Sequence, residues 1–232
     1  MCDATKLLGT PLSRHIIACL VMLVIPFDMA RAGLAEGVAA RERGDHAAAL
    51  VQFTAEAARG NAVAQLNLGR MYAAGQGVPA DDQQAISWFR KAADQGDARA
   101  QSNLGVMYET GRGVTKDERQ AVNWYRKAAD QGEAGAQTNL GRMYADGSGV
   151  TKDDQQAYFW VLLASAEGDE NAKRGRETLE RKLSPSQLAA AQTAARNWKP
   201  IIAANAAAPD AVDPFAPRAA PSTPVAPKTT AP

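Results

Sequence analysis

Three consecutive segments of this 232-residue chain repeat one pattern with a period of 36 residues and no gap. The segments are 61–96, 97–132 and 133–168. A glycine, a tyrosine and a tryptophan recur at matching positions in all three segments: Gly69, Gly105, Gly141; Tyr72, Tyr108, Tyr144; Trp88, Trp124, Trp160. A fixed period of this length is typical of stacked supersecondary units, none of which can bury its apolar face alone.

Each segment has the pattern of two helices. Ala64, Leu68 and Tyr72 are four residues apart, so they share one face of a first helix. The second helix shows a face of the same kind, made by Ala85, Trp88 and Ala92. The sequence therefore predicts an all-α fold in which every unit is a helix hairpin.

A glycine in the middle of each first helix needs a physical reason. Glycine inside a helix costs about 1 kcal/mol relative to alanine, and Gly69 recurs in every copy. We therefore expect a close approach of two helices at this glycine, over the tryptophan of a neighbouring helix. In this register Trp124 is expected to be buried between the central units.

The loop between the two helices contains paired glycines, Gly75 and Gly77, followed by Asp81. A phosphate-binding loop would occur once, between a strand and a helix. Here the loop occurs three times, between helices and beside acidic residues, so we interpret it as a helix end. Gly75 is expected to be left-handed and Gly77 to complete the turn. Asp81 and Gln84 resemble a capping box at the start of the second helix.

The strings LNLGRMYAAGQGV and KAADQG, with a D-x-x-x-A-x-x-W helix between them, resemble the Sel-one-like repeat family. This family is related to the tetratricopeptide repeats, and the resemblance covers Asn61–Gly168. It implies a right-handed α-solenoid of helix hairpins that serves as a protein-interaction adaptor, often in bacterial envelopes. Some members are linked to penicillin binding, so an envelope hydrolase of the β-lactamase or penicillin-binding type is the alternative function.

The regions on either side of the repeats keep part of the pattern. Residues 33–60 resemble a degenerate tetratricopeptide-like first unit, because Ala49 stays in register with Ala85 while the Gly-x-Gly-Val loop is missing. Residues 169–199 begin like a fourth copy but carry polar residues at apolar positions. This is typical of capping helices, which present a polar outer face at the end of a solenoid.

The two ends of the chain have compositions of their own. Residues 1–32 show a basic start, an apolar run over 16–27 and an Ala-Arg-Ala end, as in a secretory signal peptide. The run is shorter than the about 20 residues that span a bilayer, so we expect cleavage after Ala32 and a periplasmic or secreted protein. An uncleaved anchor is the alternative. Residues 200–232 hold 8 of the 12 prolines and are expected to be a disordered Ala/Pro-rich tail.

Little in the sequence supports catalysis. Both cysteines lie within residues 1–32, and His46 is the only histidine after them, so neither a zinc site nor a Ser-His-Asp set is expected. No Ser-x-x-Lys motif of the β-lactamase type occurs in the chain. Basic and acidic residues number 26 and 25, and this balance argues against nucleic acid. We expect no catalytic residue, no metal site and no cofactor.

Along the first helices, the positions that differ among the copies lie three or four residues apart, on a face away from the Ala-Leu-Tyr face. In solenoids of this kind the first helices line the concave side, so we predict that a partner protein or peptide binds there. The candidate residues are Val63, Leu66, Arg70, Arg99, Ser102, Val106, Glu109, Thr138 and Arg142. Ordinary variation of a solvated face is the alternative.

The second helix of the third copy is apolar where its siblings carry charge: Tyr158, Phe159, Leu162 and Leu163. A helix that is apolar on all sides is a buried helix. We therefore predict that the last helix, from Pro185 to about Trp198, folds back onto it and closes the solenoid. If the patch were exposed, it would mark a homo-oligomer interface.

Overall fold

The computed structural model describes residues 33–201, so the expected signal peptide and nearly all of the proline-rich tail lie outside the described residues. Residues 33–42 are helical and precede nine further helices within this range. These are α2 (His46–Ala58), α3 (Ala62–Ala74), α4 (Asp82–Asp94), α5 (Ala98–Thr110), α6 (Glu118–Asp130), α7 (Ala134–Asp146), α8 (Asp154–Ala166), α9 (Glu170–Glu180) and α10 (Pro185–Asn197).

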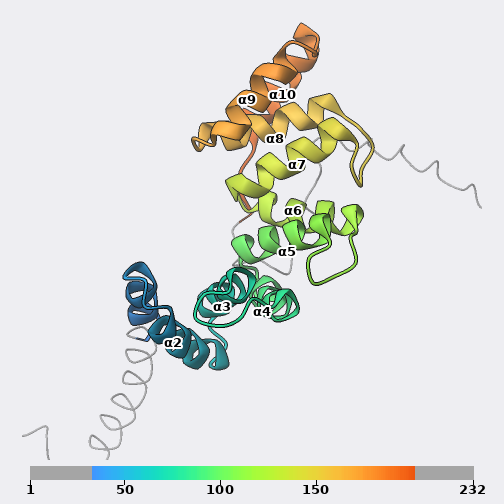
Figure 1. Ribbon diagram of the computed structural model, residues 1–232. Coiled ribbons are helices and arrows are strands. Elements are labelled where there is room, and N and C mark those ends of the chain that lie inside the picture. Colours follow the sequence, from blue (N-terminus) through green and yellow to red (C-terminus); the bar gives the residue numbers. More distant parts are fainter. Residues whose placement is uncertain (1–32, 202–232) are drawn as a thin grey trace, which may run out of the picture.

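The helices pair as hairpins that stack on one another along the chain (Figure 1). In each repeat the first helix packs most extensively on the second, and the second then contacts the first helix of the next repeat. The described residues contain no strand, which confirms the all-α α-solenoid. No helix within residues 33–201 is long and apolar enough to span a bilayer.

The helix ends confirm the turn prediction and correct the capping prediction. Gly75 ends α3 in the left-handed conformation with φ 66°. Asp81 caps α4 by accepting hydrogen bonds from the backbone N–H groups of Gln83 and Gln84. The reciprocal bond of a capping box is replaced, because the Asp81 N–H donates to the Tyr72 carbonyl at 2.9 Å. A full capping box does occur at Ser184, where α10 begins.

The close approach at the helix glycines involves a different aromatic residue from the one expected. A Cβ atom at Gly105 would lie 2.6 Å from the ring of Tyr125, and one at Gly69 would lie 2.5 Å from the ring of Phe89. Tyr125 is fully buried, whereas Trp124 is only half-buried and was wrongly expected to occupy this place. Positions 124 and 125 both lie three or four residues from Ala121 and Ala128, and the rotation of the second helix brings position 125 against the partner helix.

Trp88 and Trp124 instead pack between units. Trp88 lies against the core formed by α2 and α3, while Trp124 lies against the core formed by α3, α4 and α5. Their outer faces are covered by lysine: the Nζ atom of Lys91 sits 3.8 Å from the Trp88 ring centre, and Lys127 covers Trp124 in the same way. The lysine stem and ammonium cover only the outer face of each indole, so both tryptophans remain half-buried.

The second glycine of each loop does more than complete a turn. A Cβ atom at Gly113 would lie 2.6 Å from the carbonyl oxygen of Asp82, and one at Gly77 would lie 2.7 Å from that of His46. Each loop thus rests on the start of the preceding unit's second helix. Glycine is needed there both for its positive φ and for this backbone contact.

At the C-terminal end, α10 packs against α8, as the apolar surface of α8 predicted. Tyr158 and Phe159 are buried, and Leu162 and Leu163 are half-buried in a cluster that includes Trp198 of the last segment. This confirms the fold-back. The proposed homo-oligomer interface loses its basis, because the residues that would form it are covered within the chain.

Candidate partner-binding groove

The nine residues predicted to line one face do not share one environment. Leu66 is buried at 1% exposure in the core of α3, α4 and α5, so its assignment to a binding surface is wrong. The adjacent Gln65 is buried as well, so α3 is covered on more than one side. The repeat pattern of the sequence does not show this second covered side. Val63, Ser102 and Thr138 are half-buried, while Arg99 is exposed.

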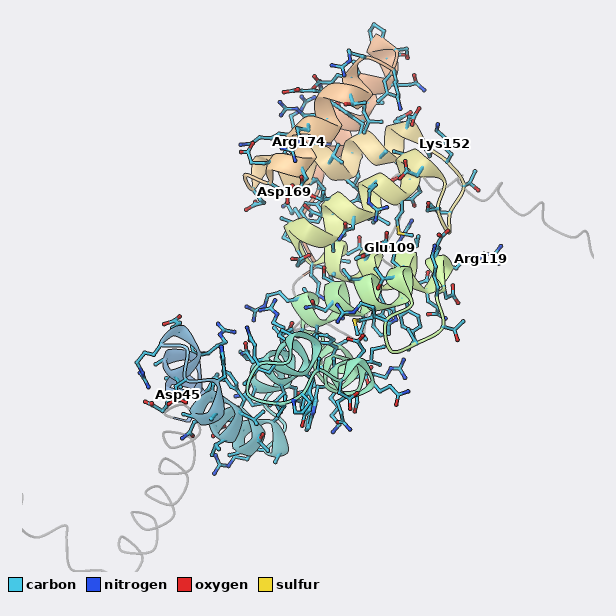
Figure 2. The ribbon with its side chains drawn as sticks, in the orientation of Figure 1. Asp45, Glu109, Arg119, Lys152, Asp169 and Arg174 are labelled. Carbon is cyan, nitrogen blue, oxygen red and sulfur yellow. The ribbon has the colours of Figure 1, made fainter. Side chains whose placement is uncertain are left out.

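Two of the predicted residues form a separate polar cluster. Arg142 of α7 donates to Glu109 of α5 at 2.5 Å, and Glu109 accepts a second hydrogen bond from the Tyr125 hydroxyl at 2.8 Å. Glu109 therefore lies between successive repeats (Figure 2). Burial and the bond to Glu109 raise the pKa of Tyr125, so its hydroxyl stays a donor. This cluster links neighbouring repeats, and few of its hydrogen-bonding groups remain available to a partner.

Arg70 and Val106 do come together, in a groove of about 550 Å³ along α3 and α5. Met71, Phe89 and Met107 are buried beneath it and provide an apolar floor, and Val106 is 36% exposed at its side. The polar residues of the groove are Arg41, His46, Asn67, Arg70, Gln76, Asn103 and Arg112. Its volume lies within the range of small-ligand and side-chain pockets.

Three arginines line this groove, and they differ in how their charges are compensated. Arg112 makes a two-point ion pair with Asp82, with contacts of 2.6 and 3.2 Å. Arg41 donates to the neutral side-chain oxygen of Asn67 at 2.5 Å. Within residues 33–201, the Arg70 side chain makes no hydrogen bond and no ion pair. The groove therefore holds two guanidinium groups without a carboxylate partner.

The electrostatic surroundings of Arg70 are unfavourable for a cation. Burial lowers the pKa of Arg70 from its ordinary value, and the nearby guanidinium groups of Arg99 and Arg41 lower it further. Asp97 and Glu133 act in the opposite direction but do not reach it with an ion pair. The guanidinium group remains charged at neutral pH, because arginine is protonated throughout this range.

Several residues of the groove were missed by the sequence analysis. Arg41 and His46 come from the degenerate first unit, and Arg112 comes from an inter-helix loop, so none lies on the first helices of the three repeats. One signal was available for Arg112: the other loops carry Gln76 and Ser148 at this position. In the described part of the chain, no group of three or more metal-ligating side chains lies together.

These features define an all-α repeat protein with a basic, apolar-floored groove formed by neighbouring units. Residues 62–97, 98–133 and 134–169 each match the Sel1 repeat, so this chain carries three consecutive Sel1 repeats. Each match begins one residue after the segment expected from the sequence. Sel1 repeat proteins generally mediate protein–protein interaction. Among curated proteins, none matches the chain.

Solved structures of similar proteins agree with this assignment. A Sel1 repeat protein from Oxalobacter formigenes is 36% identical with a TM-score of 0.58, over 60% of this chain and 57% of that one. The protein c5321, a protective antigen present in uropathogenic Escherichia coli strains and displaying an SLR fold, is 40% identical with a TM-score of 0.61. That match covers 65% of this chain and only 32% of the other.

Proposed function

We propose that this chain is an exported adaptor that binds a segment of a partner protein in the groove along α3 and α5. The observation that carries the proposal is the juxtaposition of an apolar floor and uncompensated arginines in one groove. Apolar surface with a few convergent polar groups is the usual composition of a binding site. The repeat family supports the same class of function, because such repeats generally mediate protein–protein interaction.

Filling the groove should abolish partner binding. In Val106→Trp, an indole replaces a side chain that is 36% exposed beside the groove, so a partner segment could not enter. We expect affinity capture from a periplasmic extract to lose its specific bands. The matched control is Val51→Trp on α2, where the native valine is 66% exposed and does not line the groove. Equal capture by Val106→Trp and the unsubstituted protein would place the binding surface elsewhere.

The proposal of export makes its own prediction. If residues 1–32 are a signal peptide, protein isolated from the native envelope should begin at Gly33, and its intact mass should correspond to residues 33–232. Mass spectrometry of the intact protein measures this directly. A mass that includes residues 1–32 would show that the segment is kept as an anchor, and a lipidated species beginning at Cys19 would contradict the cleavage site.

A further inference from the structure

The charge distribution of the groove leaves one arginine without any partner in the described part of the chain. The side chain of Arg70 is half-buried, and its nearest charged neighbours include two other arginines, Arg41 and Arg99. A partly buried charge costs free energy unless an opposite charge or hydrogen bonds offset the loss of water. A bound anion would therefore stabilise the charged Arg70 side chain.

The acidic side chains near Arg70 are already occupied. Asp97 caps α5 by accepting from the N–H of Ala100 at 2.9 Å, and its other oxygen lies 3.8 Å from Arg99. Glu133 caps α7 in the same way by accepting from the N–H of Ala136. A helix-capping carboxylate cannot turn toward Arg70 without leaving backbone donors unpaired. Among residues 33–201, the two carboxylates that act on Arg70 are therefore held by helix caps and do not form an ion pair with it.

Beside the cation lies apolar surface. Met71, Phe89 and Met107 form the floor, and Val106 is one of only a few large apolar side chains exposed within residues 33–201. Methionine side chains are flexible and polarisable, so such a floor can adapt to different apolar groups. An occupant that satisfies both parts of the groove needs a carboxylate and an apolar side chain close together.

We infer that the groove binds an acidic peptide segment of the partner protein, with a carboxylate of the segment paired to Arg70 and a neighbouring apolar side chain on the floor. This inference rests on the proposed function and adds the chemistry of the bound segment. Arginine and carboxylate form two-point, charge-assisted hydrogen bonds, which give both affinity and orientation. Arg41 extends the basic surface along the groove, so a second acidic residue in the segment has a partner as well.

The same charges predict that Arg70 contributes nothing to the stability of the unbound fold. Arg70→Gln removes the repulsion from Arg99 and Arg41, which is larger than the attraction of Asp97 and Glu133 that is lost with it, and it breaks no side-chain ion pair or hydrogen bond among the described residues. Its melting temperature should equal or exceed that of the unsubstituted protein. If Arg70 had a purely structural role, Arg70→Gln would lower the melting temperature.

The test uses fluorescence anisotropy with a labelled ten-residue peptide, in which two glutamates flank a leucine in a Gly–Ser background. A matched peptide replaces both glutamates with glutamine. We expect the acidic peptide to bind, its affinity to fall with added salt, and Arg70→Gln to weaken it about tenfold or more. The control is Arg119→Gln: Arg119 is exposed on α6 and lies outside the groove (Figure 2), so binding should be unchanged.

Each contrary outcome identifies what has failed. Equal binding of the glutamine peptide, or unchanged binding by Arg70→Gln, would overturn the acidic-segment inference. A decamer of deoxythymidine that competes as strongly as the acidic peptide would overturn it in favour of nucleic acid. If Val106→Trp abolishes capture of the native partner while the acidic peptide does not bind, the adaptor function stands and only the chemistry of its ligand is wrong.

Discussion

Replacing Tyr125 with alanine should lower the free energy of unfolding by about 3–5 kcal/mol, the cost typical of removing a buried aromatic side chain. Tyr125 is fully buried in the centre of the solenoid, and its hydroxyl donates to Glu109 at 2.8 Å. The substitution leaves a cavity and removes one partner from the Glu109 cluster. Thermal and denaturant melts followed by circular dichroism measure the loss.

The neighbouring residue provides the control. Trp124→Ala should cost less, about 1–2 kcal/mol, because Trp124 is only half-buried and Lys127 covers its outer face. If Trp124→Ala were the more destabilising of the two, the buried face of α6 would be assigned to the wrong residue.

A double mutant tests the contact itself. Gly105→Ala alone should be destabilising by about 1–3 kcal/mol, since its Cβ would lie 2.6 Å from the Tyr125 ring. In the Tyr125→Ala background the obstacle is gone, and alanine is the better helix former by about 1 kcal/mol. The effect of Gly105→Ala should therefore change sign. Additive effects would contradict a direct contact between the two positions.

The repeat period alone predicts most of the architecture. A 36-residue period with apolar positions every three or four residues determines the hairpins, and Gly75 and Asp81 mark where helices end and begin. The sequence did not distinguish which of two adjacent aromatic residues, at 124 or 125, faces the neighbouring helix. Both fit a helical stripe, and the choice depends on how far the second helix is rotated against the first.

The site was less predictable than the fold, for a physical reason. Differences among copies identified Arg70 and Val106, which do lie in the groove, but the same criterion included the buried Leu66. Variation occurs at the contacts between units as well as on exposed faces, because neighbouring units differ in what they pack against. Arg41 was missed because stacking brings the degenerate first unit beside α3, which no comparison among the three repeats can show.

The loop glycines illustrate the same limit. The sequence correctly assigned Gly75 to a left-handed helix end, but it assigned Gly77 only to completing the turn. In the structure Gly77 lies against the carbonyl of His46, a residue in the preceding unit. A turn can be predicted from adjacent residues, whereas a contact between units requires knowledge of how the units stack.

Removing α10 should destabilise the whole C-terminal half of the solenoid. The chain ending at Leu183 loses Ala191 and Trp198 from the core cluster and the hydrogen bond from Gln192 to the Tyr158 hydroxyl at 3.3 Å. It also loses the bond from the Ile201 N–H to the Asp130 carbonyl at 2.8 Å, which links the last segment to α6. Several apolar side chains of α8 would then face water.

We expect this truncation to cost about 3 kcal/mol or more, from the apolar area of Leu188 and Trp198, and to lower the melting temperature by about 6–12 °C. The control is a chain ending at Ile201, which keeps α10 and every contact named above and should melt like the full chain. Light scattering on both proteins should show association only for the shorter one, because its α8 surface is exposed. A monomeric truncate with an unchanged melting temperature would mean that α10 rests on the solenoid without stabilising it.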